Sequence, residues 1–201
     1  MEIKSEFIIH NFSIIIRIFF LVFFFSLNII SGYSADVNIL DFGANVNAAN
    51  NAPYIQKAID QCAAEGGGYV CTCRYFLSGS IFLRSNVHLQ LHLNAVIQGS
   101  VNRNDYQKGG FIVAEDIENA SITGDGTIDG QGGHKNFLLG DNEGGRPRLV
   151  FYNRSRNMAV KGVTLKNSPE WTLRMTDCDG VRVQGIHIYA HGNHNKGEST
   201  P

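Results

Sequence analysis

Residues 156–165 read "RNMAVKGVTL", and this short stretch decides the fold. A polar turn residue comes first, an apolar strand residue follows, and a glycine separates it from a second short apolar strand. The same order recurs in "ENASITGDGTI", residues 118–128, and in "CDGVRVQGIHI", residues 178–188. Three copies of one strand–glycine–strand unit indicate an internal repeat.

The spacing of the copies identifies the kind of repeat. Val160 and Val183 are 23 positions apart, whereas Gly124 and Gly162 are 38 apart, because a glycine-rich insertion lies between them. A period in the low twenties with short strands and no helix between them is typical of stacked solenoid coils. The sequence therefore predicts an all-β fold, a single-stranded right-handed parallel β-helix in which like residues of successive coils stack.

A helix is predicted before the first coil. The segment "APYIQKAIDQCAAEGGG" has apolar residues at a 3.6-residue period, with Pro53 at its start and glycines 66–68 at its end. We expect the helix to span about 53–64 and to cap the open end of the solenoid, which would otherwise pair with strands of other chains. The coils then span about 69–190, within a partial β-helix domain at 36–201.

Alternation of apolar and polar residues predicts which side chains point inward. In "NVHLQLHLNAVIQG", Leu89, Leu91 and Leu93 face one way, and the side chains between them face solvent. The same reasoning predicts a core that contains Leu89, Leu91, Ile122, Val160, Leu165, Val183 and Ile188.

The first 35 residues have the pattern of a secretory signal peptide. A basic start leads into the apolar run "IFFLVFFFSLNII" and the small residues "SGYSA", with cleavage expected near Ser34 or Ala35. An uncleaved anchor is the alternative, although Arg17 interrupts the apolar stretch that a membrane-spanning helix needs. We expect a secreted protein, extracellular or periplasmic, with no membrane association after cleavage.

The overall charge argues against nucleic acid as a partner. The formal net charge is −1 and no lysine or arginine run is present, so the basic surface that phosphate backbones require is missing. Export would permit disulfides, and Cys62 could pair with Cys71 or Cys73, while Cys178 is expected to be a buried apolar residue. No cysteine and histidine spacing predicts a metal site, and nothing suggests a cofactor.

Several segments together resemble the N-terminal half of the polygalacturonases, glycoside hydrolase family 28 of the pectin-lyase-like superfamily. The most specific is "LKNSPEWTL", residues 165–173, and a less specific one is the turn "GDGTIDGQG". The resemblance runs from about Val37 to His194. It implies hydrolysis of α-1,4-linked galacturonate in pectin, with inversion, and therefore pectin or polygalacturonate as the partner.

The resemblance also places the family's catalytic carboxylates in motifs that follow the last coil: an Asn-x-Asp segment, an Asp-Asp pair, Gly-His-Gly and Arg-x-Lys. This chain reads "HGNHNKGESTP" at that point, with Lys196 and Gly197 where the first aspartate is expected. The sequence thus predicts a form truncated at its C-terminal end, with no catalytic residue. His191, His194 and Arg174 are the predicted substrate-binding residues.

Other residues admit two interpretations. Asp125 and Asp129 are separated by too much extended chain to act as a hydrolytic pair, so we expect them to fix turns. Trp171 could stack on a sugar or anchor the packing between coils. Four arginines could pair with galacturonate carboxylates or be solvated surface charges: Arg146, Arg148, Arg154 and Arg174.

Three functions are compatible with this pattern. The first is a polygalacturonase-type glycosidase that is inactive as written, and the alternative is a non-catalytic secreted β-helix module that binds pectin or has a structural role. A calcium-dependent pectate lyase ranks last, because no acidic metal-binding cluster is seen.

Overall fold

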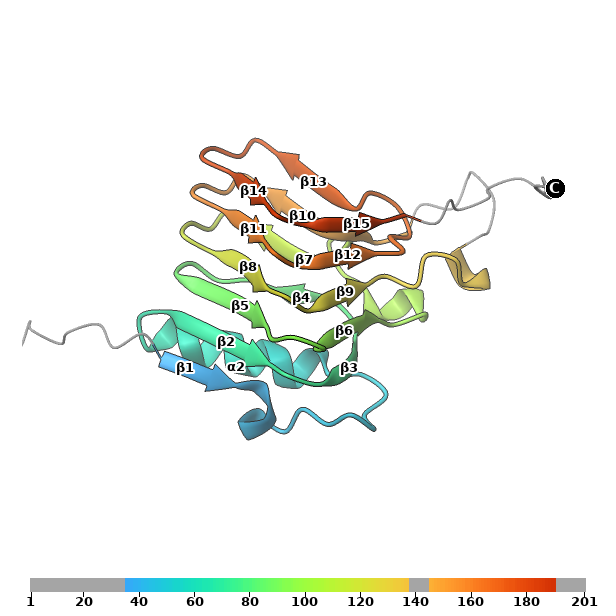
Figure 1. Ribbon diagram of the computed structural model, residues 1–201, viewed down its shortest axis with the longest axis horizontal. Helices are drawn as coiled ribbons and strands as arrows, with labels where there is room; N and C mark the ends of the chain where they lie inside the picture. Colours follow the sequence, from blue (N-terminus) through green and yellow to red (C-terminus); the bar gives the residue numbers. More distant parts are fainter. Residues whose placement is uncertain (1–34, 138–144, 191–201) are drawn as a thin grey trace, which may run out of the picture. The chain divides into compact units, whose positions relative to one another are not determined.

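The computed structural model describes residues 35–137 and 145–190, which consist mainly of short parallel strands (Figure 1). Residues 1–34, which hold most of the predicted signal peptide, lie outside this part. The strands are β1 (Ala35–Asn38), β2 (Gly68–Thr72), β3 (Tyr75–Ser78), β4 (Ile81–Phe82), β5 (Val87–Leu91), β6 (Val96–Gly99), β7 (Gly110–Glu115), β8 (Ser121–Gly124), β9 (Thr127–Asp129), β10 (Arg148–Asn153), β11 (Ala159–Lys161), β12 (Thr164–Lys166), β13 (Leu173–Thr176), β14 (Arg182–Gln184) and β15 (His187–Tyr189). The helices are α2 (Ala52–Ala64) and the 3-10 turns η1 (Ile39–Phe42), η2 (Arg103–Asp105) and η3 (Lys135–Phe137).

The strands form three parallel sheets. Sheet A has the order β1-β2-β5-β8-β11-β14, sheet B has β15-β12-β9-β6-β3, and sheet C has β13-β10-β7-β4. The chain visits sheets C, A and B in turn, as in β7–β8–β9 and β10–β11–β12, and then begins the next coil (Figure 1). This arrangement is the predicted right-handed parallel β-helix, with coils from Gly68 to Tyr189.

The register of the strands stacks apolar residues inside the coils. In sheet A, Leu89 pairs with Ile122, Ile122 with Val160, and Val160 with Val183, which confirms the predicted repeat register. Sheet B stacks Ile97, Ile128, Leu165 and Ile188 in the same way. Each large apolar side chain buried in such a stack contributes about 1.5–3 kcal/mol relative to an exposed one.

The predicted core is right for five of its seven residues. Leu89, Leu91, Ile122, Val160 and Leu165 are fully buried. Val183 and Ile188 are 46% and 50% exposed, although they stand in the predicted register, because no strand that the structure describes packs on the open side of β14 and β15.

Leu93 also departs from its expectation, since it is 70% exposed. Strand β5 ends at Leu91, so the alternation that the sequence suggests does not continue through residues 92–94. Asn94 there adopts a left-handed backbone conformation with φ of 66°, which turns the chain from sheet A into sheet B. The apolar period alone did not reveal this turn.

Helix α2 covers the first coil. Its apolar face is fully buried through Ile55, Ala58, Ile59 and Cys62, and it lies beside β2 at the N-terminal end of the stack (Figure 1). Gln56 also satisfies the exposed edge of sheet C, because its Nε2 donates to the Phe82 carbonyl (2.9 Å) and its Oε1 accepts from the Phe82 N–H (2.8 Å). The helix therefore closes both the core and a strand edge.

The disulfide that the sequence left possible, between Cys62 and Cys71 or Cys73, does not form in the structure, where all four cysteines are free thiols. The physical reason is their placement on opposite sides of β2. Cys62 points from α2 into the core, whereas the Cys71 Sγ lies 3.6 Å from the Gln90 Oε1 on the outer row and Cys73 is exposed. Cys178 is partly buried against the core.

Asparagines line the corner between sheets C and A. Asn86, Asn119 and Asn157 all have positive φ, at 64°, 57° and 51°. The Asn119 Nδ2 donates to the Asn86 Oδ1 (3.1 Å), and the Asn157 Nδ2 donates to the Asn119 Oδ1 (2.7 Å). Asparagine tolerates this backbone conformation better than most residues, so the predicted polar turn residues fix both the corner and the spacing of the coils.

The corner between sheets A and B is made by glycines instead. Gly124, Gly162 and Gly185 have φ of 112°, 75° and 61°. A Cβ on Gly124 would lie 2.0 Å from the Leu91 carbonyl oxygen of the preceding coil. A Cβ on Gly162 would likewise lie 2.5 Å from the Gly124 carbonyl oxygen, so both conformation and close approach require these two glycines, whereas at Gly185 only the positive φ does.

We predict that Asn119→Ala lowers the free energy of unfolding by about 2 kcal/mol. The variant loses two side-chain hydrogen bonds of about 0.5–1.5 kcal/mol each and places alanine at positive φ. Asn119→Gly should lose about 1 kcal/mol less, because glycine adopts this φ without strain. Urea unfolding of both variants measures the difference, and an equal loss in the two would contradict the role of φ.

Candidate functional site

The outer face of sheet C gathers aromatic and cationic side chains. Residues Val113, Phe151 and Arg174 stand in register on β7, β10 and β13. The Arg148 guanidinium lies 4.8 Å from the centre of the Phe151 ring, and the Arg174 guanidinium lies 5.9 Å from the centre of the Trp171 ring. This face thus presents two cation–π pairs on adjacent coils.

The arginines of this face differ in how their charge is balanced. Arg148 forms an ion pair with Glu170 (Nε to Oε2, 3.4 Å), and Arg154 is paired with two carboxylates. Arg174 has no acidic partner within residues 35–137 and 145–190. Trp171 beside it is 58% exposed, so in the last coil described it does not act as a buried packing anchor.

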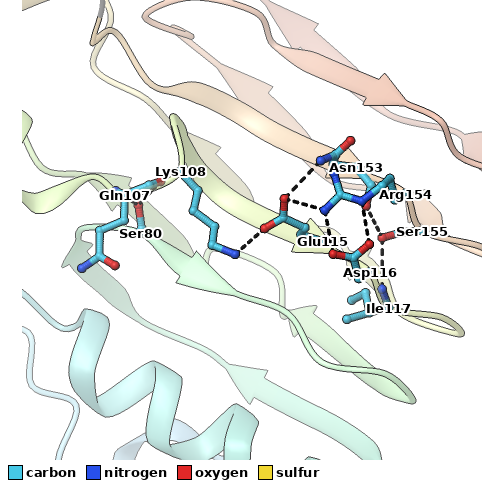
Figure 2. A network of polar contacts seen from close by, with 9 residues as sticks. All are labelled: Ser80, Gln107, Lys108, Glu115, Asp116, Ile117, Asn153, Arg154 and Ser155. Carbon is cyan, nitrogen blue, oxygen red and sulfur yellow. Dashed lines mark hydrogen bonds and ion pairs between the residues drawn. The ribbon is translucent and has the colours of Figure 1, made fainter.

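A polar network lies on the same sheet, at the ends of β7 and β10 (Figure 2). Figure 2 shows the Glu115 carboxylate between the amine of Lys108 and the guanidinium of Arg154. Arg154 binds Asp116 through two hydrogen bonds of 2.7 Å each, and the Asn153 Nδ2 donates to the Glu115 Oε1 (3.1 Å). The network joins two consecutive coils.

Glu115 and Asp116 are adjacent carboxylates on an exposed face, so they must be considered as a catalytic pair. Hydrogen bonds from Lys108, Asn153 and Arg154 lower the pKa of Glu115, and the hydrogen bonds from Arg154 lower the pKa of Asp116. Both groups are therefore ionised at neutral pH, whereas glycoside hydrolysis needs one carboxylic acid that still holds its proton. The pair holds the coils together and cannot supply the general acid.

Sequence reasoning missed this network, although a signal for it was present. The coil that contains β7 and the coil that contains β10 are offset by 38 residues, which is also the spacing of Gly124 and Gly162. The same offset places Asn153 beside Glu115 and Arg154 beside Asp116. Charged residues one coil period apart could thus have been paired from the sequence.

The outer face of sheet B has a shallow hollow of about 430 Å³. It is lined by Val96, Thr127, Asp129, Thr164, Lys166 and Tyr189. Asp129 is its one carboxylate, and the Asp129 Oδ1 accepts from the Gln131 N–H (3.0 Å) and from the Asn167 Nδ2 (3.1 Å). The prediction that Asp129 fixes a turn is confirmed. A hollow with a single carboxylate cannot provide both an acid and a base.

Asp125 lies at the corner between β8 and β9, where its backbone N–H donates to the Leu91 carbonyl (3.0 Å). In the part of the chain that the structure describes, no three side chains of histidine, cysteine, aspartate or glutamate gather closely enough to hold a metal ion. No helix in the same part is long and apolar enough to cross a membrane.

The structure describes only one of the three predicted substrate-binding residues. Arg174 is on the outer face of β13, whereas His191 and His194 lie outside the described residues, as do Lys196 and Gly197. The substrate-binding role of all three therefore stays a prediction.

The amino-acid sequence of this chain is similar to those of known proteins. The sequence model of Glycosyl hydrolases family 28 matches residues 72–198. A polygalacturonase of Ralstonia solanacearum is 29% identical over 192 residues, which cover 73% of this chain and 35% of that protein. The chain spans a little over a third of the length of the curated relatives that it matches.

Solved structures show the same architecture. A hyperthermoactive exopolygalacturonase from Thermotoga maritima superimposes with a TM-score of 0.70 at 24% identity, over 79% of this chain and 47% of that one. The polygalacturonase from Erwinia carotovora gives a TM-score of 0.62 at 27% identity, over 77% and 48% of the two chains.

We predict that Arg154→Gln destabilises the protein in a pH-dependent way. The lowered pKa values of Glu115 and Asp116 mean that their stabilising contribution is complete above the unfolded-state values near pH 4 and is lost as the pH falls through the lower folded-state values. The difference in unfolding free energy between the native protein and the variant should thus be full at pH 7 and shrink below about pH 4.

Urea unfolding at several pH values measures this difference. Arg156→Gln is the matched control, because the Arg156 side chain is 75% exposed and its nearest carboxylate oxygen, on Glu118, is 3.7 Å away. A loss of stability for Arg154→Gln that is the same at pH 3 and pH 7 would contradict the assigned ion pairs.

Proposed function

The chain belongs to glycosyl hydrolase family 28, and from this membership we propose that its coils are the substrate-binding part of a polygalacturonase-type protein. The reaction of such a protein is the hydrolysis of α-1,4-galacturonosidic bonds in pectin. In this proposal the described coils hold the polysaccharide on the outer face of sheet C.

The observation that carries the proposal is the pairing of Arg174 with Trp171. Arg174 is the arginine of the sheet C face whose charge no described carboxylate balances, and the Trp171 ring beside it is exposed. Each galacturonate unit carries one carboxylate on a sugar ring. A guanidinium can bind a carboxylate through two parallel hydrogen bonds, and an aromatic ring offers an apolar surface to the sugar.

We infer that the same described coils do not carry out bond cleavage. Inverting hydrolysis uses a protonated acid and a carboxylate base about 6.5–9.5 Å apart. Glu115 and Asp116 are both ionised in their ion pairs, and Asp129 is the one carboxylate of the hollow on sheet B. We therefore propose that residues 35–137 and 145–190 bind substrate and do not cleave it.

We also propose that the protein is exported to the periplasm or the extracellular space. The basic start and the apolar run of residues 1–35 support this location. N-terminal sequencing of the mature protein tests it, since a new N-terminus near Ala35 is expected and an N-terminus at Met1 would contradict it.

We predict that the purified 201-residue chain does not release reducing ends from polygalacturonate. The physical reason is that residues 35–137 and 145–190 show no acid–base pair suited to hydrolysis, and each such group is worth about 10²- to 10⁴-fold in rate. A reducing-sugar assay against a heat-inactivated sample measures the activity. Release that Asp125→Asn or Asp129→Asn abolishes would show that one of these aspartates is catalytic.

We predict that Arg174→Ala weakens the binding of trigalacturonate by about tenfold, because a hydrogen-bonded charge pair is lost. Isothermal titration calorimetry of the full chain measures the affinity. Arg156→Ala, which removes an exposed arginine from the sheet C–sheet A corner, is the control and should bind as the native chain does. Equal affinities for the native chain and Arg174→Ala would remove the support for this binding face.

A further inference from the structure

A second hollow lies on the outer face of sheet A, away from the Arg174 face. The outward residues of neighbouring strands stand in one row, Tyr69, His88, Ser121, Ala159 and Arg182. The two small side chains in the middle, Ser121 and Ala159, leave a depression between the rings on one side and the arginine on the other. Its volume is about 390 Å³, within the roughly 300–1,000 Å³ of small-molecule sites.

The floor and walls of this hollow are polar. The His88 Nδ1 lies 2.9 Å from the Ser121 Oγ, and the Tyr69 and His88 rings are in contact with their centres 5.0 Å apart. Thr123 on the adjacent outward row has a buried Oγ1 that has no hydrogen-bond partner. Burial lowers the pKa of His88, so its ring is neutral at pH 7 and offers hydrogen bonds rather than charge.

The rim carries positive charge and no negative charge. Lys161 and Arg182 line the hollow, and they are diagonal neighbours on the adjacent strands β11 and β14. No carboxylate lines it, and neither cation has an acidic partner within the ranges that the structure describes. The remaining polar groups of the rim are the amides of Asn119 and Asn157 from the asparagine corner.

We propose that the hollow on sheet A is a binding site for a single anionic sugar unit, a uronate. Arg182 and Lys161 bind the carboxylate, since two unbalanced cations at one edge favour an anion. The Thr123 hydroxyl, the Ser121–His88 pair and the asparagine amides bind the ring hydroxyls. Tyr69, which is 37% exposed, provides the flat apolar wall that a sugar face needs.

This site is separate from the face that contains Arg174, because sheets A and C are different sides of the coil. It stands on its own residues and does not rest on the proposed function. If both sites bind uronates, one chain can hold two points of an acidic polysaccharide, which raises the effective affinity for the polymer.

The test is a titration of the ¹⁵N-labelled full chain with galacturonate, followed through the backbone amide signals. We expect saturable shifts at Ser121, Thr123 and Ala159 in the native chain. Lys161→Gln with Arg182→Gln should weaken this binding by about tenfold or more. Ala159→Leu, which fills the centre of the hollow and keeps its charges, should abolish the shifts. Saturation of either variant at the native affinity would overturn the proposal.

Three comparisons make the result specific. Arg174→Ala should leave the shifts in the hollow unchanged, so failure of the sheet C proposal and failure of this one are distinguishable. Neutral galactose should not saturate the site. Inorganic sulfate should compete only weakly with galacturonate. If sulfate shifts the same amide signals at the same concentration as galacturonate, the hollow binds simple anions and the proposal of a uronate site is overturned.

Discussion

Every surface of this protein depends on one constraint, the in-register stacking of apolar residues between successive parallel coils. The row that joins Leu89, Ile122, Val160 and Val183 fixes which residues of sheet A point inward. Because side chains alternate along a strand, the same register fixes the outward rows. A slip of one residue would expose the core and also take apart the Glu115–Arg154 network and the hollow on sheet A. The register of the strands therefore determines both the stability of the core and the side chains that the surface presents.

The three outer faces use that register for different purposes. On sheet C, Arg154 pairs with Glu115 and Asp116 of the preceding coil, and Lys108 pairs with Glu115 close by in sequence, so part of the charge there joins the coils. Arg174 departs from this balance. On sheet A, the small residues Ser121 and Ala159 lie beside Lys161 and Arg182, cations that no described carboxylate balances. The hollow on sheet B has one carboxylate, Asp129, which already accepts hydrogen bonds in a turn. Among residues 35–137 and 145–190, the carboxylates of Glu115, Asp116 and Asp129 are engaged in structural contacts, and the two faces with unbalanced positive charge are suited to binding anions.

The predictions from sequence were wrong where a strand ends or where no further coil packs on a strand, because the alternation of apolar residues does not show either feature. Leu93 continues the apolar alternation of β5, but the strand ends before it. Val183 and Ile188 occupy the correct register and are nevertheless exposed, because burial requires a coil on each side. The disulfide that the sequence left possible is absent for a related reason. Cys62 and Cys71 are close in sequence, yet Cys62 lies on the core side and Cys71 on the outer side of a strand.

The sequence by itself determined the repeat, the capping helix, the turn residues and the family, since these depend on periodicity and on local backbone preferences. Glycine or asparagine at a corner and valine or isoleucine in a strand carry that information within a few residues. Only the tertiary structure decided which charges are neutralised and which remain unbalanced. Asp116 and Arg154 meet across 38 residues, and the hollow on sheet A joins side chains of five strands. Which residues of successive coils lie beside each other depends on the lengths of the loops between the strands. These pairings can be read only once the coils are stacked in the three-dimensional structure.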